Sequence, residues 1–480
     1  MVPLLSVVVP FYNVEPYITE CLKSLAAQTI EDLEVILVDD GSQDGSRQVA
    51  EDFAGRDERF VLVEQSNRGP GPARDEGVRR ARGTYLAFAD SDDVVPPDAY
   101  RQLVASLRET GSDLACGGVR RIVDGQTAES TLHEKVFRRR QLCTHITDRT
   151  SLVRDRTVWN KVYRMDFWRA QELSFPAGIY EDVPVAMRAH VLATTVDVLD
   201  DVVYHWRKRE SGETSITQRR AELANLHERL AAIRSVRAFL DERAPELLRP
   251  FDALVLEKDI AFLFQALEEG GAHEPLVDLG NAWLAELSPQ ALAAAPSLRR
   301  LELHLLRRGL VRELCHVREF RRSRVDGTRV VARGLRNVGW YGDYPYFRDR
   351  RLRIPDEVFD AREELKLVAK VDECAWTGDA FRLHGQVSIH RVERKPGKVY
   401  LWLSDGKRKV PLEARRLRDH RFVADIDPSL LARGGPTWKL HVRAETKGLV
   451  LKTHFRHGEA PGTWRFTVPG WSRSGMDISQ

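Results

Sequence analysis

The first 120 residues alternate between continuous apolar runs and stretches with helical spacing. Leu4–Pro10 and Leu33–Val38 are apolar and rich in β-branched residues, which is typical of strands buried on both faces. Alternating strands and helices predict a parallel sheet covered by helices, with ligand sites at the carboxyl ends of its strands. The other predicted strands are Phe60–Glu64 and Tyr85–Ala89, and the predicted helices are 15–28, 46–53 and 73–81.

The pattern changes twice further along the chain. Residues 120–215 mix short strands and loops, whereas apolar residues recur at helical spacing through 217–316. From about residue 330, short β-branched and aromatic runs alternate with turns, which predicts a β-sandwich. We therefore expect an α/β domain at 1–216, a helical, arginine-rich region at 217–325 and an immunoglobulin-like β-sandwich at 326–480. The predicted sandwich strands are 365–371, 381–389, 398–403, 422–426, 438–442 and 449–455.

Composition narrows the class of protein. The chain has 480 residues, of which 42% are hydrophobic and 30% charged, so two or three domains can each bury a core. Its longest apolar run, Leu4–Tyr12, is far shorter than the roughly 20 residues that span a bilayer. No basic segment or cleavage site of a signal peptide opens the chain. The five cysteines lack metal-ligand spacing, so we expect a reduced, cytoplasmic protein.

Acidic residues follow two of the predicted strands. Asp90-Ser91-Asp92-Asp93 ends the fourth strand and Asp39-Asp40 ends the second, while a glycine-rich basic loop runs from Asn67 to Arg74. Clustered carboxylates repel one another unless a cation lies between them, and hard oxygen ligands suit Mg²⁺ or Mn²⁺. The alternatives are a surface turn that caps the next helix and a plain glycine turn with a solvated arginine. No P-loop and no dinucleotide fingerprint is present.

An ordered set of motifs in residues 1–220 resembles family 2 glycosyltransferases with the GT-A fold. Asp75 departs from that family, which usually has Asn at this position, and we expect little effect. The prolines at 70 and 72 are a second departure, which would stiffen their loop. The matching motifs are Ser6–Asn13, Val38–Asp44, Asn67–Gly69, Ala73–Gly77, Phe88–Asp93, Trp159–Tyr163, Glu181-Asp182, Tyr204–Arg207 and Ser215–Thr217.

The resemblance implies that a sugar is transferred from a nucleotide diphosphate, usually UDP, with inversion at the anomeric carbon. The donor would be UDP-GlcNAc, UDP-GalNAc, UDP-Glc or UDP-Gal, with Mn²⁺ or Mg²⁺ as cofactor. Asp40 would hold the uracil ring, and Asp92 would bind the metal on the diphosphate. The division of roles among Asp90, Asp92 and Asp93 stays open. Further residues implied to bind the nucleotide-sugar are Pro10, Tyr12, Asn67, Arg74, Asp90, Ser91, Asp93 and Arg207.

Asp182 is the candidate general base, by resemblance to the Glu-Asp pair of the family. An attacking hydroxyl must lose its proton, and one carboxylate within hydrogen-bond reach suffices. The alternative is a helix cap, since Val183–Leu192 has helical character and acidic residues are favoured at helix starts.

The segment after the predicted strand Val202–Tyr204 supplies further candidates. His205 is a candidate metal or phosphate ligand, with Arg207 and Arg209 as alternatives. Ser215 would lie on a loop that closes over the donor. Trp159 and Lys161 would shape the acceptor side, and for Trp159 a place in the core is equally open.

A basic segment follows the helices. Residues 299–353 hold 16 arginines against 6 acidic residues, a net charge of +10. Three interpretations stay open: a solvated helical face, attraction to an anionic polymer, and peripheral contact with the inner face of an anionic membrane. Nucleic acid is not an expected partner, because no recognised module accompanies the charge. The aromatic residues 340–347 could stack on sugar rings, but a seam between domains is favoured.

The layout of a GT-A domain, helices and β-sandwich resembles that of teichoic acid and capsular polysaccharide transferases. It predicts an anionic polysaccharide or teichoic-acid-like acceptor, and a homo-oligomer formed through the C-terminal domain. The leading hypothesis is an inverting, metal-dependent glycosyltransferase. The alternative is a non-catalytic polymer-binding or scaffold subunit on a transferase fold, and a nucleotidyl or glycerophosphoryl transferase is a third possibility.

Overall fold

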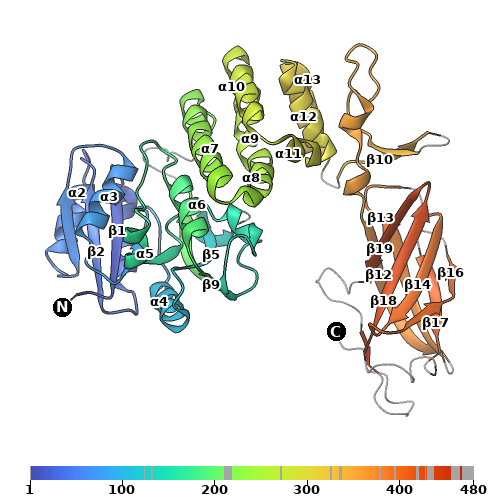
Figure 1. Cartoon of the computed structure of the whole chain (residues 1–480), viewed down its shortest axis with the longest axis horizontal. Helices are drawn as coiled ribbons and strands as arrows, with labels where there is room; N and C mark the ends of the chain where they lie inside the picture. Colours follow the sequence, from blue (N-terminus) through green and yellow to red (C-terminus); the bar gives the residue numbers. More distant parts are fainter. Residues whose placement is uncertain are drawn as a thin grey trace. The chain divides into compact units, whose positions relative to one another are not determined.

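The chain forms two compact units, Met1–Ala294 and Ala295–Gln480, in a computed structural model (Figure 1). The three-part division predicted above stays a prediction. Across the described residues, no helix is both long and apolar enough to cross a membrane. The structure describes residues 2–467 except 124, 131–132, 210–218, 271–272, 325–326, 335–337, 378–379, 394–395, 418–420, 428, 430–436 and 456–464.

The first half of the N-terminal sheet is parallel, as the sequence predicts. Its strands are β1 (Leu5–Phe11), β2 (Leu33–Asp39), β3 (Phe60–Glu64) and β4 (Tyr85–Phe88), arranged in the order β3-β2-β1-β4. Every residue of β1 and β2 is buried, which explains their uninterrupted apolar sequences. The core of this half therefore lies on both faces of β1 and β2.

Helices alternate with these strands along the chain. They are α1 (Glu15–Ala26), α2 (Ser46–Ala54), α3 (Pro70–Arg80) and α4 (Ala99–Thr110). Helix α3 begins three residues before the predicted start, because Gly69 adopts a φ of 91° and Pro70 then occupies the first turn, where its missing N–H costs nothing. Gly77 lets α3 approach β1 closely, since a side chain there would collide with Val8.

The second half of the sheet is mixed rather than parallel. Strand β8 (Lys161–Arg164) lies between β4 and β5 (Leu114–Val123) and runs antiparallel to both, whereas β9 (Val196–Arg207) runs parallel to β5. The parallel sheet was predicted only from the alternating units of residues 1–120, and the weak pattern of residues 120–215 gives no strand directions. The remaining elements are β6 (Gln126–Glu129), β7 (Gln141–Thr144), η1 (Thr150–Arg154), α5 (Met165–Ala170) and α6 (Asp182–Leu192).

A group of helices completes the N-terminal unit (Figure 1). Helix α7 packs on α6, and α8 packs on η1, so the helical region contacts the α/β part directly. Helix α9 ends before Gly270 and α10 begins after it. The elements are α7 (Leu223–Arg243), η2 (Pro245–Leu247), α8 (Leu248–Leu254), the π-helix η3 (Val255–Asp259), α9 (Ile260–Glu268), α10 (His273–Glu286) and α11 (Pro289–Ala294).

The C-terminal unit contains two antiparallel sheets with one shared hydrophobic core. One sheet has the order β12-β13-β17-β16, and the other has β15-β14-β18-β19 with β20 paired to β18. The predicted β-sandwich is thus present, although three short strands were missed. The elements of the whole C-terminal unit are α12 (Ser297–Arg307), α13 (Val311–Ser323), β10 (Val330–Arg333), β11 (Gly339–Gly342), η4 (Asp356–Phe359), η5 (Arg362–Glu364), β12 (Leu367–Thr377), β13 (Ala380–Ile389), β14 (Lys398–Ser404), β15 (Lys409–Leu412), β16 (Ala414–Arg416), β17 (Arg421–Ile426), β18 (Thr437–Thr446), β19 (Leu449–His454) and β20 (Arg465–Thr467).

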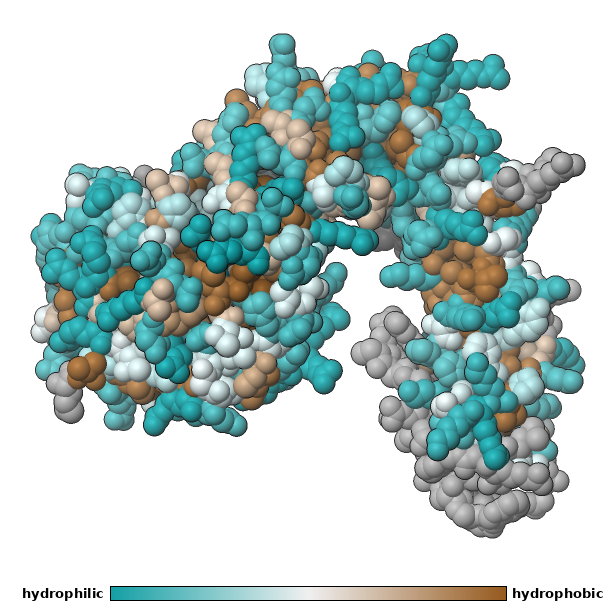
Figure 2. Space-filling view, viewed as in Figure 1, coloured by the Kyte–Doolittle hydropathy of each residue, from teal (hydrophilic) through white to brown (hydrophobic). Residues whose placement is uncertain are grey.

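Part of the basic segment is built into this unit rather than presented to solvent. Arg299 is buried and lies 2.9 Å from the carboxylate of Glu302, which is fully buried, whereas Arg321 lies 3.4 Å from this carboxylate with its side chain 47% exposed. Trp340 and Tyr344 of the aromatic cluster are also buried, so neither ring face is free to stack on a sugar. The cluster packs within the C-terminal unit, whose viewed face nevertheless carries a hydrophobic patch (Figure 2).

Candidate active site

The carboxyl ends of β1, β2 and β4 lie at one edge of the N-terminal sheet, because β1 runs parallel to both neighbours. Tyr12 and Asp40 directly follow β1 and β2, and Asp90 lies two residues after the end of β4, so the three residues come together there. Tyr12 is 39% exposed and free to contact a ligand. Pro10 is buried inside β1 opposite Val38, so it shapes the strand and lies behind this edge.

The carboxylate of Asp40 organises the loop that leads into α3. It accepts hydrogen bonds from Gln65 Nε2 (2.7 Å) and from the backbone N–H groups of Arg68 (2.8 Å) and Gly69 (2.8 Å). Asn67 lies in the same loop with its side chain exposed. Asp40 thus has a structural task beside the predicted contact with a uracil ring, which stays a prediction.

Arg74 links three segments that are far apart in the sequence. Its guanidinium donates to Asp90 Oδ1 (2.7 Å) and to Glu181 Oε1, and it lies over the ring of Phe175. Burial lowers the pKa of Arg74, but the charges of Asp90 and Glu181 outweigh this effect and raise it. Burial also raises the pKa of Glu181, against the influence of Arg74. Arg74 therefore fixes the acidic loop relative to the Glu181-Asp182 pair.

Asp75, the departure from the family pattern, lies beside this arrangement. Its carboxylate accepts the backbone N–H of Phe175 at 3.1 Å. An Asn side chain offers an acceptor oxygen in the same place, so the substitution is compatible with this contact.

The acidic loop concentrates negative charge in a poorly hydrated place. Asp92 accepts a hydrogen bond from Arg209 Nε (2.6 Å), and Asp93 accepts the backbone N–H of Arg207 (2.7 Å). Burial raises the pKa of Asp92, opposed by Arg209. Burial and the charges of Asp92 and Asp90 raise the pKa of Asp93 well above its usual range. Such a loop gains from any further positive charge brought by a ligand.

Strand β9 delivers the two arginines to this loop. The strand extends to Arg207 and so includes His205 and Arg207, which were predicted to follow a short strand, while Arg209 lies two residues beyond its end. Arg207 donates to the backbone oxygen of Asp92 (2.8 Å) and to Glu20 (2.6 Å), and it lies over the ring of Tyr17. No pattern in the sequence predicts these contacts with α1. Ser215 lies outside the described residues.

The acidic loop offers the type of donor that a hard divalent cation requires, but only part of a metal site. Among the described residues, no three His, Cys, Asp or Glu side chains are grouped to hold an ion. Sites that take one or two carboxylates and complete the shell with substrate phosphates fit Asp92. Ser91 is buried within the loop. His205 faces Arg120, its partner on β5, and burial and Arg120 lower its pKa, so its role as a ligand stays a prediction.

Asp182 is the first residue of α6, directly after the Glu181 that binds Arg74. Glu181 holds the N-cap position and no side chain caps the helix, so the interpretation of Asp182 as a helix cap was wrong. Burial raises the pKa of Asp182 to about 7, aided by Glu181 and Asp90 and opposed by Arg74 and Arg156. A carboxyl group with a pKa near neutrality is well matched to proton abstraction at neutral pH.

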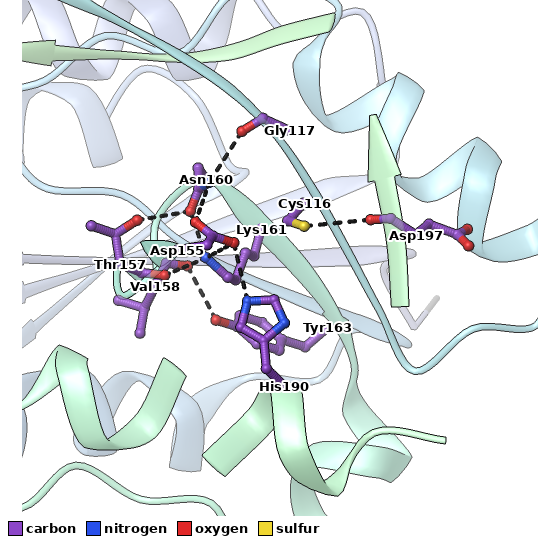
Figure 3. Close-up of polar contacts among 10 residues, drawn as sticks. All are labelled: Cys116, Gly117, Asp155, Thr157, Val158, Asn160, Lys161, Tyr163, His190 and Asp197. Carbon is purple, nitrogen blue, oxygen red and sulfur yellow. Dashed lines mark hydrogen bonds and ion pairs between the residues drawn. The ribbon is translucent and has the colours of Figure 1, made fainter. Parts of the chain in front are cut away.

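Trp159 and Lys161 are buried. Lys161 is fully buried and its ammonium group lies 2.7 Å from Asp155, which also contacts His190 of α6 at 3.1 Å (Figure 3). Lys161 donates further to Asn160 Oδ1 (2.7 Å). The expectation that Lys161 shapes the side of the site that binds the sugar acceptor was wrong. Its ammonium group is buried and needs the oxygen atoms of Asp155 and Asn160 as hydrogen-bonding partners.

Tyr204 joins that buried cluster to the acidic loop. The ring of Trp159 stacks on the ring of Tyr204, with centroids 4.2 Å apart, and the Tyr204 hydroxyl accepts the backbone N–H of Asp90 at 2.9 Å. Trp159 is thus a core residue, one of the two roles left open above. The sequence analysis did not predict this role of Tyr204, which lies where two consecutive residues of β9, Val203 and Tyr204, are buried.

Comparison with known proteins agrees with this arrangement. Residues 6–168 match the family described as Glycosyl transferase family 2. The chain is 35% identical over 221 residues to the uncharacterized glycosyltransferase EpsJ of Bacillus subtilis (strain 168), covering 45% of this chain and 64% of that protein. It is 28% identical over 217 residues to the poly(ribitol-phosphate) beta-N-acetylglucosaminyltransferase TarS of Staphylococcus aureus (strain MW2), covering 43% and 36%. The chain therefore spans less than two thirds of these relatives.

Solved structures share the fold. The crystal structure of S. aureus TarS superposes with a TM-score of 0.59 at 17% identity, covering 99% of this chain and 84% of that one. The structure of TarS 1–349 in complex with UDP-GlcNAc gives a TM-score of 0.55 at 21% identity, covering 72% and 97%. The predicted fold class is thereby confirmed: a GT-A domain, a helical middle and C-terminal sheets.

Proposed function

Because residues 6–168 belong to Glycosyl transferase family 2, we propose that the chain is an inverting glycosyltransferase that moves a hexose from a UDP-sugar to a hydroxyl group of an anionic cell-surface polymer. The observation that carries this proposal is the constellation of Asp182, Glu181, Arg74 and Asp90. Two carboxylates and one arginine from distant segments meet beside a carboxyl group whose pKa is raised to about 7.

Asp182 acts as the general base. The acceptor oxygen attacks the anomeric carbon from the face opposite the departing diphosphate, and Asp182 takes its proton. Glu181 is occupied by Arg74, which leaves Asp182 as the carboxylate available for this task. General base catalysis of this kind contributes about 10²–10⁴-fold to a rate.

Charge develops on the diphosphate as its bond to the sugar breaks. A divalent cation, when bound with the nucleotide, neutralises that charge, and Asp92 would hold it. The side chains of Arg207 and Arg209 lie around the same loop. Asp90, held by Arg74 and by the hydroxyl of Tyr204, lies where the ribose or sugar of the donor is expected.

The acceptor class is inferred from relatives and from charge. The relatives that this chain matches include a poly(ribitol-phosphate) beta-glucosyltransferase and a poly(ribitol-phosphate) beta-N-acetylglucosaminyltransferase. The net charge of +10 over residues 299–353 favours a phosphate-rich polymer, even though some of these arginines are internally paired. The predicted homo-oligomer, peripheral membrane contact and cytoplasmic location belong to the same proposal.

Nucleotide release tests the proposal. The purified chain is incubated with a panel of UDP-, GDP- and dTDP-sugars, with Mn²⁺ or EDTA, in the presence and absence of poly(ribitol phosphate). We expect metal-dependent release of UDP from one UDP-sugar, accelerated by the polymer. Absence of release from every donor, together with failure to bind UDP and Mn²⁺ in calorimetry, would support the non-catalytic alternative instead.

A further inference from the structure

The helical region packs against the residues that directly precede Asp182. The guanidinium carbon of Arg229 on α7 lies 4.0 Å from the centroid of the Tyr180 ring. The hydroxyl group of Tyr180 donates a hydrogen bond to the side chain of Asn225 on the same helix. Gly178 has a φ of 115° and lies against Glu228 of α7. The start of α6 is thus held by contacts that the α/β domain alone does not provide.

Asp259 ties this contact to the α/β domain. It is fully buried at the end of the π-helix η3, and its two oxygens accept from Arg229 Nη1 (2.6 Å) and from Arg156 Nη1 (2.9 Å). Burial raises the pKa of Asp259, but the two arginines outweigh it and lower the pKa. A π-helix is a rare conformation that recurs at functional sites, and here it places a charged side chain between two segments.

Arg156 lies in the segment between η1 and β8. It follows Asp155, whose carboxylate contacts His190 of α6 and the buried Lys161 (Figure 3). One carboxylate in the helical region therefore fastens both the segment before Asp182 and the loop beside its helix. The charged groups that shift the pKa of Asp182 are Glu181, Arg74, Asp90 and Arg156. The charge of Asp182 in turn raises the pKa of Tyr163 and of Tyr180.

We propose that Asp259 is a positioning residue for the transfer reaction. By holding Arg156 and Arg229, Asp259 fixes the segment that carries Asp182. Its negative charge also offsets the positive charge that Arg156 exerts on Asp182. The inference rests on the proposed role of Asp182 as base. This inference gives the helical region a part in the reaction. The match to the family covers only residues 6–168 and therefore does not include that region. Asp259 itself does not touch the substrate.

Two substitutions in the full chain test this with opposite signs. In Asp259→Asn the charge of Arg156 is no longer offset, so the pKa of Asp182 falls and the acid limb of kcat/KM moves to lower pH. In Arg156→Gln a positive charge is lost near Asp182, so the limb moves to higher pH. Each shift should be about half a pH unit or more. In Asp259→Asn, kcat above the limb should fall about tenfold with the KM for the UDP-sugar within about twofold, as expected when the base is misplaced by a small distance.

A matched control lies two residues away. Glu257 pairs with Arg154 at 2.8 Å at the protein surface, so Glu257→Gln removes a comparable ion pair of η3 without touching Arg156. It should leave the pH profile and kcat unchanged, and Arg156→Lys should return the limb of Arg156→Gln toward that of the parent. If the acid limb of kcat/KM lies at the same pH in the parent, Asp259→Asn and Arg156→Gln, the inference about Asp259 is overturned and the proposed function is not affected. A parent chain without turnover would instead contradict the proposed function.

A second readout does not require turnover. The ionisation of Asp182 is obtained from the difference in unfolding free energy between the chain and Asp182→Asn as a function of pH. The pKa derived in this way should rise when Arg156→Gln is introduced into both proteins. If it stays the same, Arg156 does not act on Asp182 and the inference fails even if the variants lose stability.

Discussion

The guanidinium of Arg74 lies 2.7 Å from Asp90 Oδ1 and joins the acidic loop after β4 to the start of α6. Its side chain is only 6% exposed, so this is a buried charge shared between two carboxylates. The donor-binding and proton-accepting halves of the site are therefore held in register by one side chain. The loss of Arg74 should be felt by both halves.

Arg74→Met should destabilise the fold and the site together. Removing one partner of a buried ion pair costs about 3–5 kcal/mol, because the remaining carboxylates stay buried without compensation. Since Glu181 is the buried partner and Asp90 is 29% exposed, we expect a loss toward the lower end of that range in the free energy of unfolding from urea titration, and a weaker affinity for UDP in calorimetry. Arg56→Met, at an arginine whose side chain is 80% exposed, should change neither quantity. An Arg74→Met protein as stable as that control would contradict the assignment.

The rate should depend on the ionisation of Asp182. Its pKa is raised to about 7, so the carboxylate is protonated and unable to accept a proton at lower pH. We expect kcat/KM to rise through an acid limb near pH 7 and to lie about tenfold lower one unit below that limb. Since Glu181 and Asp182 influence each other, the limb reports the pair rather than either group alone. A profile that is flat from pH 5 to 8 would exclude a base with this pKa.

The buried Lys161–Asp155 pair should matter for stability and not for acceptor binding. Lys161→Met leaves the Asp155 carboxylate without its cation, which should cost about 3–5 kcal/mol in urea unfolding at pH 7. Burial raises the pKa of Asp155, but Lys161 and His190 outweigh it and lower the pKa, so this stabilisation is present above the unfolded-state pKa and is lost as the pH falls through the folded-state value. Lys23→Met at an exposed position is the control. A rise in acceptor KM without loss of stability would restore the acceptor role.

Asp40→Ala should release the loop at residues 65–69. The two backbone N–H groups of Arg68 and Gly69 lose their shared acceptor, and the start of α3 is no longer tied to β2. We expect the Kd for UDP to increase about tenfold, corresponding to about 1.4 kcal/mol. Asp57→Asn, in a turn between α2 and β3, should bind UDP like the parent chain. An unchanged Kd in Asp40→Ala would remove Asp40 from the nucleotide pocket.

The sequence predicts the parallel half of the sheet well, because β1 and β2 are buried on both faces and read as uninterrupted apolar runs. It predicts the place of the acidic loop for the same reason, since parallel strands end at one edge. It does not predict the direction of β8, a four-residue strand whose length carries no periodic signal.

The contacts of individual charged residues were the least predictable part of the site. Lys161 lies in the motif Trp159–Tyr163 and was assigned to the acceptor side, but the fold buries it completely against Asp155. Nothing local to Asp259 indicates that it pairs with Arg156, 103 residues earlier, and with Arg229. Such pairings arise from tertiary packing, so they become visible only with the structure.

The most direct test of the central claim is a single-turnover measurement of sugar transfer by the chain and by Asp182→Asn at pH 8, with UDP binding measured in parallel. The Asn side chain keeps the shape of the site and cannot accept the proton from the acceptor. We expect transfer to fall by about 10²–10⁴-fold, with the Kd for UDP within about twofold. Transfer by Asp182→Asn at the rate of the parent chain would show that another group is the base.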